Sequence, residues 1–482
     1  MCSKTNKMKE LFKFLGFLVI VIIMASCKKS KDKDVVAEPM LSVSSSEELF
    51  TADAGVSEVT VTSNTQWSIS NAASWCTAAA STTNGNGKIS LNVQSNPNTT
   101  ERLATISVNA GSISKQFNVR QLGKPNSDSI PADQTGMSSN AVQLASKIKL
   151  GINIGNTLEA IGGETNWGNP KVTKAFIDFV KQSGFNAVRI PCSWNQYVLN
   201  TSTNQIKPEW LDRVKEVVQY CIDDGLYVLL NIHWDGGWLD NNINSQAQAS
   251  VIEKQKAFWK QIGIKMRDFD EHLMFASANE PPVDNATQMS ILLSYHQTFI
   301  DAVRSTGGRN AYRVLVVQGP STDIDKTNTL MNTLPVDRIV NRMMAEVHYY
   351  SPYQFCLMEQ DESWGKMFYY WGNGYHSTTD LSRNATWGEE DYVVEEFLKM
   401  KTKFSDKGIP VILGEYGAYR RTTPLDMVKH QASVDHWITY VTKQAIAHGL
   451  KPFWWDTGGA LDRRNYTVKD QRTIDALIAG GQ

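Results

Sequence analysis

The chain has 482 residues, which is too long for one ordinary domain and predicts two domains, one of them large. Lys and Arg number 48 against 49 Asp and Glu, so the formal net charge of -1 provides neither a basic excess for a nucleic-acid partner nor an acidic tail typical of disorder. The 14 Trp residues suit stacking on flat, uncharged faces such as sugar rings, although some must belong to the core.

An export signal is predicted at the N-terminus, over residues 1–26. Basic residues precede an apolar run that is too short for a stable membrane anchor and that ends in the sequence MASC, residues 24–27. This ending resembles a bacterial lipobox, which implies cleavage before Cys27 and lipid attachment to its sulfur. Residues 27–37 would then be a solvated tether. We expect an envelope lipoprotein in the outer membrane, on its cell-surface or periplasmic face; an ordinary cleaved signal peptide is the alternative.

Residues 38–123 are rich in Ser, Thr, Asn and Gly and show short alternating runs without a helical period. Three strands are predicted, near residues 59–62, 89–93 and 104–108. This pattern predicts a small immunoglobulin-like β-sandwich. The segment resembles a BACON domain, a module that accompanies glycan-degrading enzymes. Its two Trp residues, Trp67 and Trp75, are expected to face the core, which favours a spacer role over sugar binding.

After a linker predicted over residues 124–137, apolar strands alternate regularly with helical stretches. The eight predicted strands lie near residues 150–154, 187–190, 227–232, 273–278, 314–317, 343–348, 411–413 and 452–455. The weakest helical stretch, residues 327–334, follows the fifth strand. Eight such units predict a (β/α)8 TIM barrel over residues 138–482 in place of a doubly wound sheet.

Two of these strands end in a carboxylate. The fourth runs into Asn279 and Glu280, after which two prolines end the ladder, and the seventh runs into Glu415. Reactive groups of barrel enzymes lie at the C-terminal ends of strands, and two carboxylates are the minimum equipment for hydrolysing a glycosidic bond. Because a single Glu at such a place could equally be a helix cap or a solvated loop acid, the argument rests on the pair.

Several other strands end in polar or aromatic side chains that could serve the same site. These are Arg189, His233, Trp234, His348, Tyr350 and Trp455. Each has a structural alternative, namely an ordinary ion pair, a core imidazole or wall packing. Their convergence at one end of an otherwise apolar barrel would be costly without a function, so we interpret them as candidate site residues.

The chain resembles glycoside hydrolase family 5 over roughly its last three-quarters. The matching segments are GINIGNTL (151–158), VRIP (188–191), NIHW (231–234), NEP (279–281), HYY (348–350), GEYG (414–417) and WWD (454–456). The first-strand and third-strand motifs are most similar to a subfamily of endo-β-1,4-glucanases that includes xyloglucan-cleaving enzymes. No metal or other cofactor is expected, and the six Cys residues show no metal-ligand spacing.

The resemblance implies a role for each candidate residue. Glu280 would be the general acid/base, keeping its proton near neutral pH, and Glu415 the nucleophile of a double displacement. Arg189 and Tyr350 would donate hydrogen bonds to Glu415, and Asn279 would bind the sugar 2-hydroxyl. His233 and His348 would position the substrate and Glu280. Trp455 would form the floor beneath the bound sugar. Trp234 replaces the second His of a His-His pair that is common in the subfamily, which leaves that contact unassigned.

Three loops are expected to wall the substrate: residues 160–169, residues 235–244 with Trp238, and the long aromatic segment 351–388, which could instead be a lid packed on itself. We therefore predict a monomeric, retaining endo-β-1,4-glucanase that acts on plant β-glucans, including xyloglucan. An endo-β-1,4-mannanase of the same fold and a non-catalytic glycan-binding lipoprotein are the alternatives. The presence of both Glu280 and Glu415 speaks against the non-catalytic binder, which has no need of the pair.

Overall fold

The computed structural model describes residues 38–98, 101–123 and 130–482. The predicted signal peptide, Cys27, the tether and residues 124–129 of the predicted linker lie outside the described residues. Within the described part of the chain, no helix is both long enough and apolar enough to cross a membrane.

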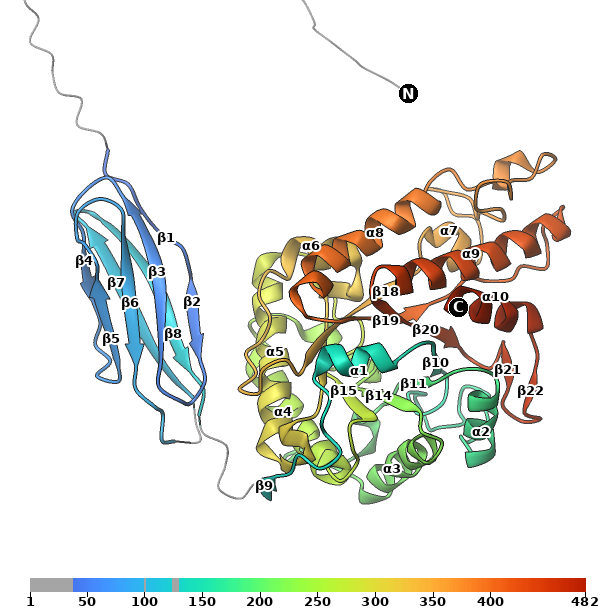
Figure 1. The fold of residues 1–482 in the computed structure, drawn as a ribbon, viewed down its shortest axis with the longest axis horizontal. Coiled ribbons are helices and arrows are strands. Elements are labelled where there is room, and N and C mark those ends of the chain that lie inside the picture. The colour runs from blue at the N-terminus through green and yellow to red at the C-terminus, as the bar shows by residue number, and fades with distance from the viewer. Residues whose placement is uncertain (1–37, 99–100, 124–129) are drawn as a thin grey trace, which may run out of the picture.

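The N-terminal domain consists of two four-stranded sheets (Figure 1). One sheet has the order β1 (Leu41–Val43), β3 (Gly55–Ser63), β6 (Gly87–Val93), β5 (Cys76–Ala80), and the other has the order β2 (Glu47–Phe50), β8 (Ile113–Gln121), β7 (Arg102–Ala110), β4 (Ser68–Ser70). Alternate side chains from both sheets, such as Val59 and Phe117, share one core. The indole of Trp67 is buried there, whereas Trp75 is half-buried beneath the guanidinium of Arg102. The predicted small β domain is confirmed.

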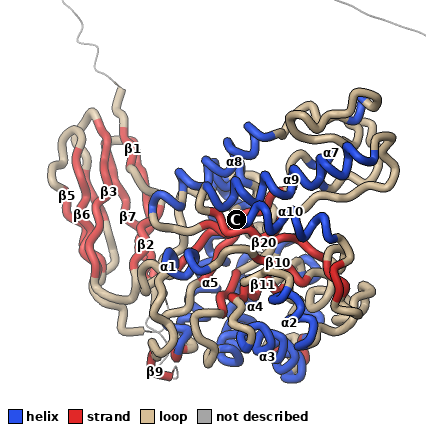
Figure 2. Tube along the Cα trace, turned by 45° about the vertical axis from the view of Figure 1, so that its right-hand side comes forward, coloured by secondary structure: helices blue, strands red, loops and turns tan. Residues whose placement is uncertain are grey.

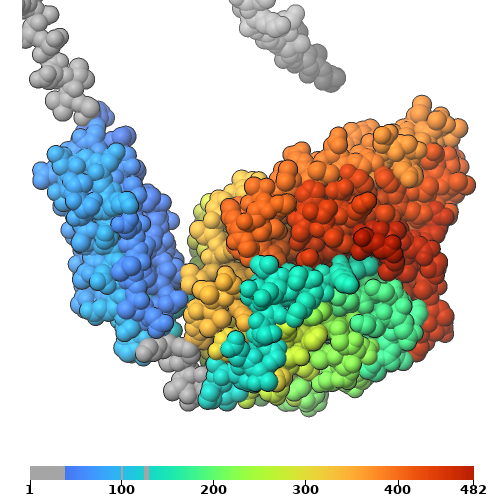
Figure 3. Space-filling view, in the orientation of Figure 1, coloured from blue at the N-terminus to red at the C-terminus, as the bar shows by residue number. Residues whose placement is uncertain are grey.

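Eight parallel strands close into a barrel, as the alternation of strands and helices predicted. They are β10 (Gly151–Ile154), β11 (Ala187–Ile190), β14 (Tyr227–Asn231), β15 (Leu273–Ala276), β17 (Leu315–Gln318), β18 (Met343–Tyr349), β19 (Val411–Tyr416) and β20 (Leu450–Asp456). The ring closes where β10 pairs with both β11 and β20. In Figure 3 the C-terminal segment, in red, accordingly lies against the start of the barrel, in teal.

Helices surround this barrel (Figure 2). They are α2 (Lys174–Gln182), α3 (Pro208–Asp223), α4 (Gln248–Met266), α5 (Ala286–Ser305), α6 (Ile324–Leu330), the short α7 (Tyr353–Cys356), α8 (Glu390–Lys403), α9 (Met427–Ala447) and α10 (Gln471–Gly481). Many begin at a side chain that accepts a hydrogen bond from the first turn, as Thr173 and Asn285 do at the starts of α2 and α5. The only α-helix of the fifth connection is the seven-residue α6, in agreement with the weak helical signal there.

The N-terminal end of the barrel is closed by helix α1 (Ala141–Lys147). Its Leu144 packs with inward-facing strand residues such as Leu229 and Met274 in one apolar cluster. Three short strand pairs lie outside the barrel: β9 (Ile130–Ala132) with β16 (Gly307–Gly308), β12 (Val198–Asn200) with β13 (Gln205–Ile206), and β21 (Leu461–Asp462) with β22 (Thr467–Val468). Because one end is plugged, any large site must open at the other.

Candidate active site

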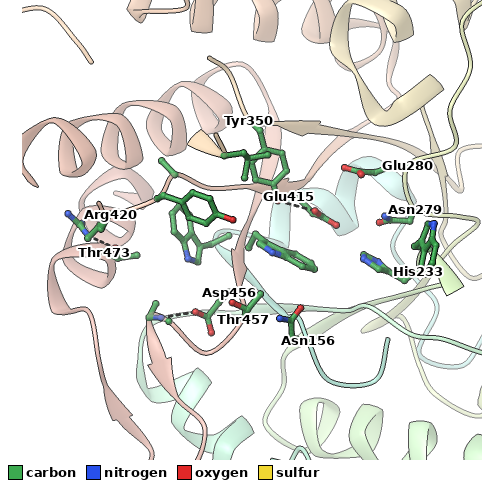
Figure 4. Close-up of a pocket in the computed structure, with 18 of the residues that line it drawn as sticks. Asn156, His233, Asn279, Glu280, Tyr350, Glu415, Arg420, Asp456, Thr457 and Thr473 are labelled. Atoms are coloured by element: carbon green, nitrogen blue, oxygen red, sulfur yellow. Dashed lines mark hydrogen bonds between the residues drawn. The ribbon is translucent and has the colours of Figure 1, made fainter. Parts of the chain in front are cut away.

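A cleft with a volume of about 940 Å³ lies at the C-terminal ends of the barrel strands. Six strands or the loops that follow them contribute to its walls: β10, β14, β15, β18, β19 and β20. Figure 4 shows Arg420 and Thr473 at one end of the cleft, Glu415 in the middle, and Glu280 with Asn279 and His233 toward the other end. The predicted site residues Trp234, Tyr350 and Trp455 also line it.

Glu280 and Glu415 face each other across this cleft. Each places a carboxylate oxygen within 4.8 Å of the other, although the two residues come from strands that are not neighbours. The side chain of Glu280 is 44% exposed and that of Glu415 only 7% exposed. This separation agrees better with the roughly 5–5.5 Å spacing typical of double displacement than with the roughly 6.5–9.5 Å gap that leaves room for a water between the carboxylates.

Arg189 lies completely buried beneath the cleft and connects four strands through its guanidinium. Its Nη1 lies 2.7 Å from Glu415 Oε1 and 3.0 Å from Asn153 Oδ1. The other terminal nitrogen donates to Asn279 Oδ1 at 2.9 Å, and Nε forms an ion pair with Glu346 Oε1 at 2.9 Å. Because a planar guanidinium holds its partners in fixed directions, Arg189 sets the positions of both Glu415 and Asn279.

A shift in strand register brings His348 beside the two carboxylates. Gly414 is the extra residue, so that His348 of β18 pairs with Glu415 of β19. A side chain at position 414 would collide with Glu346, since a Cβ there would lie 2.0 Å from its Oε1. The imidazole Nδ1 of His348 lies 2.7 Å from Glu280 Oε1 and 3.8 Å from Glu415 Oε2. A bulge that aims a side chain in this way is common beside active sites.

The protonation of this cluster follows from its charges. Burial lowers the pKa of His348, but the carboxylates of Glu415, Glu280 and Glu346 outweigh it and raise the pKa to about 9. Although burial raises the pKa of Glu280, the hydrogen bond and charge of His348 lower it overall. For Glu415, burial raises the pKa against the charges of His348 and Arg189.

The sequence-based expectation that Glu280 keeps its own proton therefore does not describe the free protein. A cationic His348 lies against Glu280 and makes its ionised form the favoured one. The pair still keeps a proton on His348 Nδ1, which lies 2.7 Å from Glu280 Oε1. Filling the cleft with a sugar would remove water from the exposed side of the Glu280 carboxylate. Desolvation favours the neutral acid, so substrate binding moves the pKa of Glu280 in the direction that its predicted role requires.

Aromatic rings form the floor and one wall of the cleft. The imidazole of His233 and the indole of Trp455 are parallel within 5°, with their centroids 5.8 Å apart. Burial and the charge of Arg189 lower the pKa of His233 well below its usual value, so this imidazole is neutral. A Cβ at position 155 would lie 2.9 Å from the Trp455 ring, which explains the glycine at the end of β10. Tyr350 donates its hydroxyl to Glu415 Oε2 at 3.0 Å.

The two tryptophans of the third-strand loop take different places. Trp234 lines the cleft and is 46% exposed. Trp238, which the sequence placed among the substrate-binding residues, is buried: its indole packs edge-on against Phe258 and donates to Asp235 Oδ2 at 2.8 Å. The loop turns back on the barrel because Asp235, Gly236 and Gly237 all have positive φ. The expectation that Trp238 contacts substrate is therefore wrong.

The long segment 351–388 is largely packed on itself and on α9, as one of its two interpretations stated. Five of its aromatic side chains are buried, namely Phe355, Phe368, Tyr369, Tyr370 and Trp371. Three are exposed, namely Tyr353, Trp364 and Trp387, and none of these lines the cleft. The loop supports the cleft wall through Leu357, while Tyr419 from the next loop supplies the exposed ring there.

Sequence reasoning missed Glu346, which is fully buried and contacts both Arg189 and His348. It lies beneath His348, with its Oε1 3.3 Å from the imidazole Nε2, and it also accepts from Gln318. The signal was present in the sequence, because a Glu two residues before His348 on an apolar strand must point to the same face.

The only group of three metal-type ligands found among the described residues is Glu280, His348 and Glu415, which offer one atom each within 4.8 Å of one another. A divalent cation would have to displace the proton of His348, whose pKa is about 9. The arrangement therefore suits proton transfer better than metal binding.

Comparison with known proteins places this geometry in a family. Residues 152–460 match the family described as cellulase (glycosyl hydrolase family 5), and residues 65–122 match the BACON family. A xyloglucan-specific endo-β-1,4-glucanase of Bacteroides ovatus is 35% identical over 441 residues, which cover 86% of this chain and 86% of that protein.

Two solved structures are also similar. A Bacteroides ovatus GH5 xyloglucanase in complex with a XXXG heptasaccharide superimposes with a TM-score of 0.74 at 32% identity, covering 92% of this chain and all of that one. A GH5-4 broad specificity endoglucanase from Ruminococcus champanellensis with bound cellotriose gives a TM-score of 0.61 at 30% identity, covering 70% of this chain and 98% of that one.

Proposed function

Because the chain belongs to glycosyl hydrolase family 5, the cellulase family, we propose that it is a retaining endo-β-1,4-glucanase whose substrates include xyloglucan. The observation that supports this most is the pair of carboxylates, Glu280 and Glu415, with oxygens within 4.8 Å across one cleft. Two such groups on opposite sides of a glycosidic bond are sufficient for its hydrolysis without a cofactor.

In the first step, a carboxylate oxygen of Glu415 attacks the anomeric carbon. The bond from that carbon to the leaving sugar's oxygen breaks, and this oxygen takes a proton from Glu280. In the second step, water attacks the anomeric carbon of the glycosyl-enzyme, gives its proton to Glu280 and releases Glu415. His348, within 2.7 Å of Glu280, holds the proton that the acid requires between turnovers.

The surrounding residues serve these two steps. Arg189 and Tyr350 each donate to one oxygen of Glu415, which orients it and favours its ionised form. Asn279, fixed by Arg189 through its Oδ1, keeps its side-chain N–H groups available for the sugar 2-hydroxyl. Neutral His233 and the ring of Trp455 lie at the floor of the cleft and would hold the sugar on which Glu415 acts.

The substrate proposal rests on the shape of the cleft and on the relatives. Two exposed rings line the cleft, Tyr419 next to Arg420 in the sequence and Trp234 next to His233, with 44% and 46% of their surfaces accessible. Arg420 and His233 lie at opposite ends of the cleft in Figure 4. Rings on both sides suit a polymer that continues past the cleaved bond. The heptasaccharide-bound relative is described as a xyloglucanase, the cellotriose-bound relative as a broad specificity endoglucanase, and the 35% identical relative as a xyloglucan-specific endo-β-1,4-glucanase.

A panel of four polysaccharides tests the proposal. Reducing sugar released from xyloglucan, carboxymethylcellulose, mixed-linkage glucan and mannan should appear with the glucans and be highest with xyloglucan. Cleavage of mannan alone would replace the glucanase by a mannanase. Binding of a glucan without any cleavage would instead support a non-catalytic capture protein.

We also propose that the protein is an envelope lipoprotein anchored through Cys27. The support is the sequence alone: a basic start, an apolar run over residues 15–24 and small residues before the cysteine. A Cys27→Ser variant should then leave the membrane fraction and lose labelling by radioactive palmitate. Equal membrane retention of both forms would contradict a lipid on this sulfur.

A further inference from the structure

Another acidic side chain that lines the cleft, that of Asp240, has no partner among the described residues. Asp240 begins a short 3-10 helix, Asp240–Asn242, in the loop that follows β14, and its side chain lines the cleft. Only 6% of the residue is exposed. Among the described residues, its carboxyl forms neither a hydrogen bond nor an ion pair.

Asp235, five residues earlier in the same loop, is a buried acid whose hydrogen-bonding capacity is filled by the protein. It is equally buried, but it accepts hydrogen bonds from the backbone of Trp194 and Asn195 and from the side chains of Ser193 and Trp238. Burying a carboxyl without such donors costs free energy, so a protein that retains one at the edge of a binding cleft leaves its hydrogen-bonding capacity for a ligand.

The charges around Asp240 are all negative. Burial, and then the carboxylates of Glu280 and Asp235, raise the pKa of Asp240 to about 8. Near neutral pH the side chain is therefore mostly a neutral acid, with one O–H donor and a carbonyl acceptor. A sugar hydroxyl also donates one hydrogen bond and accepts others, so the two groups are complementary.

The position along the cleft identifies which sugar would be bound. Arg420 and Thr473 lie at one end, Glu415 in the middle, and Glu280 with His233 toward the other end (Figure 4). Asp240 belongs to the loop that follows β14, and this loop enters the cleft at His233, on the Glu280 side. The charge of Glu280 acts on Asp240, in agreement with this placement. The leaving sugar must place its oxygen against the acid, so it occupies that side.

We propose that Asp240 binds a hydroxyl group of the sugar on the leaving-group side of the scissile bond, which makes it a substrate-binding residue of the β-glucan site. This inference rests on the proposed hydrolase function. The loop that follows β14 would then contact the part of the sugar chain that leaves in the first step.

The test compares two substrates that differ on that side only. An aryl β-cellobioside has a phenol as its leaving group, whereas cellotetraose and longer chains place sugars there. Asp240→Ala should lower kcat/KM about tenfold on the oligosaccharide and change it less than twofold on the aryl cellobioside. Asp240→Asn is the matched control, because an amide of the same size still donates and accepts; it should retain kcat/KM on both substrates within about threefold.

A merely structural role would give a different pattern. Asp240→Ala would then lower the melting temperature and reduce activity equally on both substrates, and either equal losses or no loss on the oligosaccharide would overturn the inference. A wild-type protein that cleaves neither substrate would refute the proposed function, and the sugar contact with it.

Discussion

At the N-terminal end of the barrel, Leu144 of α1 packs against Leu229 and Met274 in an apolar cluster. At the other end of the same strands, Arg189, Glu346, His348 and Glu415 are buried together. Burying apolar groups stabilises the fold, whereas removing ionised groups from water costs free energy that only good geometry offsets. The difference teaches that one end of the barrel is built for stability and the other for chemistry.

The largest effect is expected at the chemical end. Glu415→Gln removes the nucleophile but keeps the size of the side chain and an acceptor for Arg189. Activity on glucan should fall on the order of 10⁴–10⁶-fold, as it does when other covalent catalysts lose their nucleophile. Initial rates measure the loss of activity, and a thermal melt checks that the variant is folded. If the variant keeps a tenth of the wild-type activity, Glu415 is not the nucleophile.

Glu280→Gln should show a loss that depends on the leaving group. Without the acid, hydrolysis of glucan should fall about 10²–10⁴-fold. A dinitrophenyl cellobioside leaves without protonation, so formation of its glycosyl-enzyme, seen as a burst of phenol, should remain fast. Equal slowing of burst and glucan hydrolysis would contradict the role of Glu280 as the acid.

Leu144→Ala tests the N-terminal end of the barrel. Truncating this fully buried side chain should lower the free energy of unfolding by about 2–5 kcal/mol. Below the melting transition, kcat should stay at the wild-type value because no catalytic group moves. Denaturant unfolding measures the first quantity and glucan hydrolysis the second; a changed kcat would show that the two ends are coupled.

The two ends should also differ in their response to pH. The pKa of His348 is about 9 in the folded protein, above the 6.5 of a free imidazole, so the folded state binds more protons between these values. Stability from this group is complete below pH 6.5 and is lost as the pH rises toward 9, by up to about 3 kcal/mol.

Melting temperatures at pH 6.5 and pH 9 measure this loss. His348→Asn should reduce the difference between the two values, whereas Leu144→Ala should leave it unchanged because Leu144 does not titrate. If the difference in melting temperature is as large in His348→Asn as in the wild type, another group causes it. Glu159 and Asp240 would be the candidates, since burial also raises their pKa values to about 7 and about 8.

The strands of the barrel were predictable because each is a short, mostly apolar run, a pattern that buried parallel strands impose on the sequence. The short strands of the sandwich were harder, since β2, β4 and β5 have only 4, 3 and 5 residues and expose much of their surface. Tertiary pairing, not local pattern, makes them strands.

At the site, Glu280 and Glu415 could be predicted because a strand end fixes where its side chain points. Trp238 could not, because the direction of a loop depends on backbone angles such as the positive φ of Gly236 and Gly237. Nor does a sequence show the contacts that set protonation: the lowered pKa of Glu280 arises from His348, 68 residues away in the chain.

The stereochemistry of the first product tests the account most directly, because it reports whether the oxygens of Glu280 and Glu415, within 4.8 Å of one another, perform a double displacement. Proton NMR during the first minutes of cello-oligosaccharide hydrolysis distinguishes the two anomers before they interconvert. The account predicts that the β-anomer appears first and the α-anomer only later, by mutarotation. Immediate appearance of the α-anomer would mean that water attacks the sugar directly, and would contradict it.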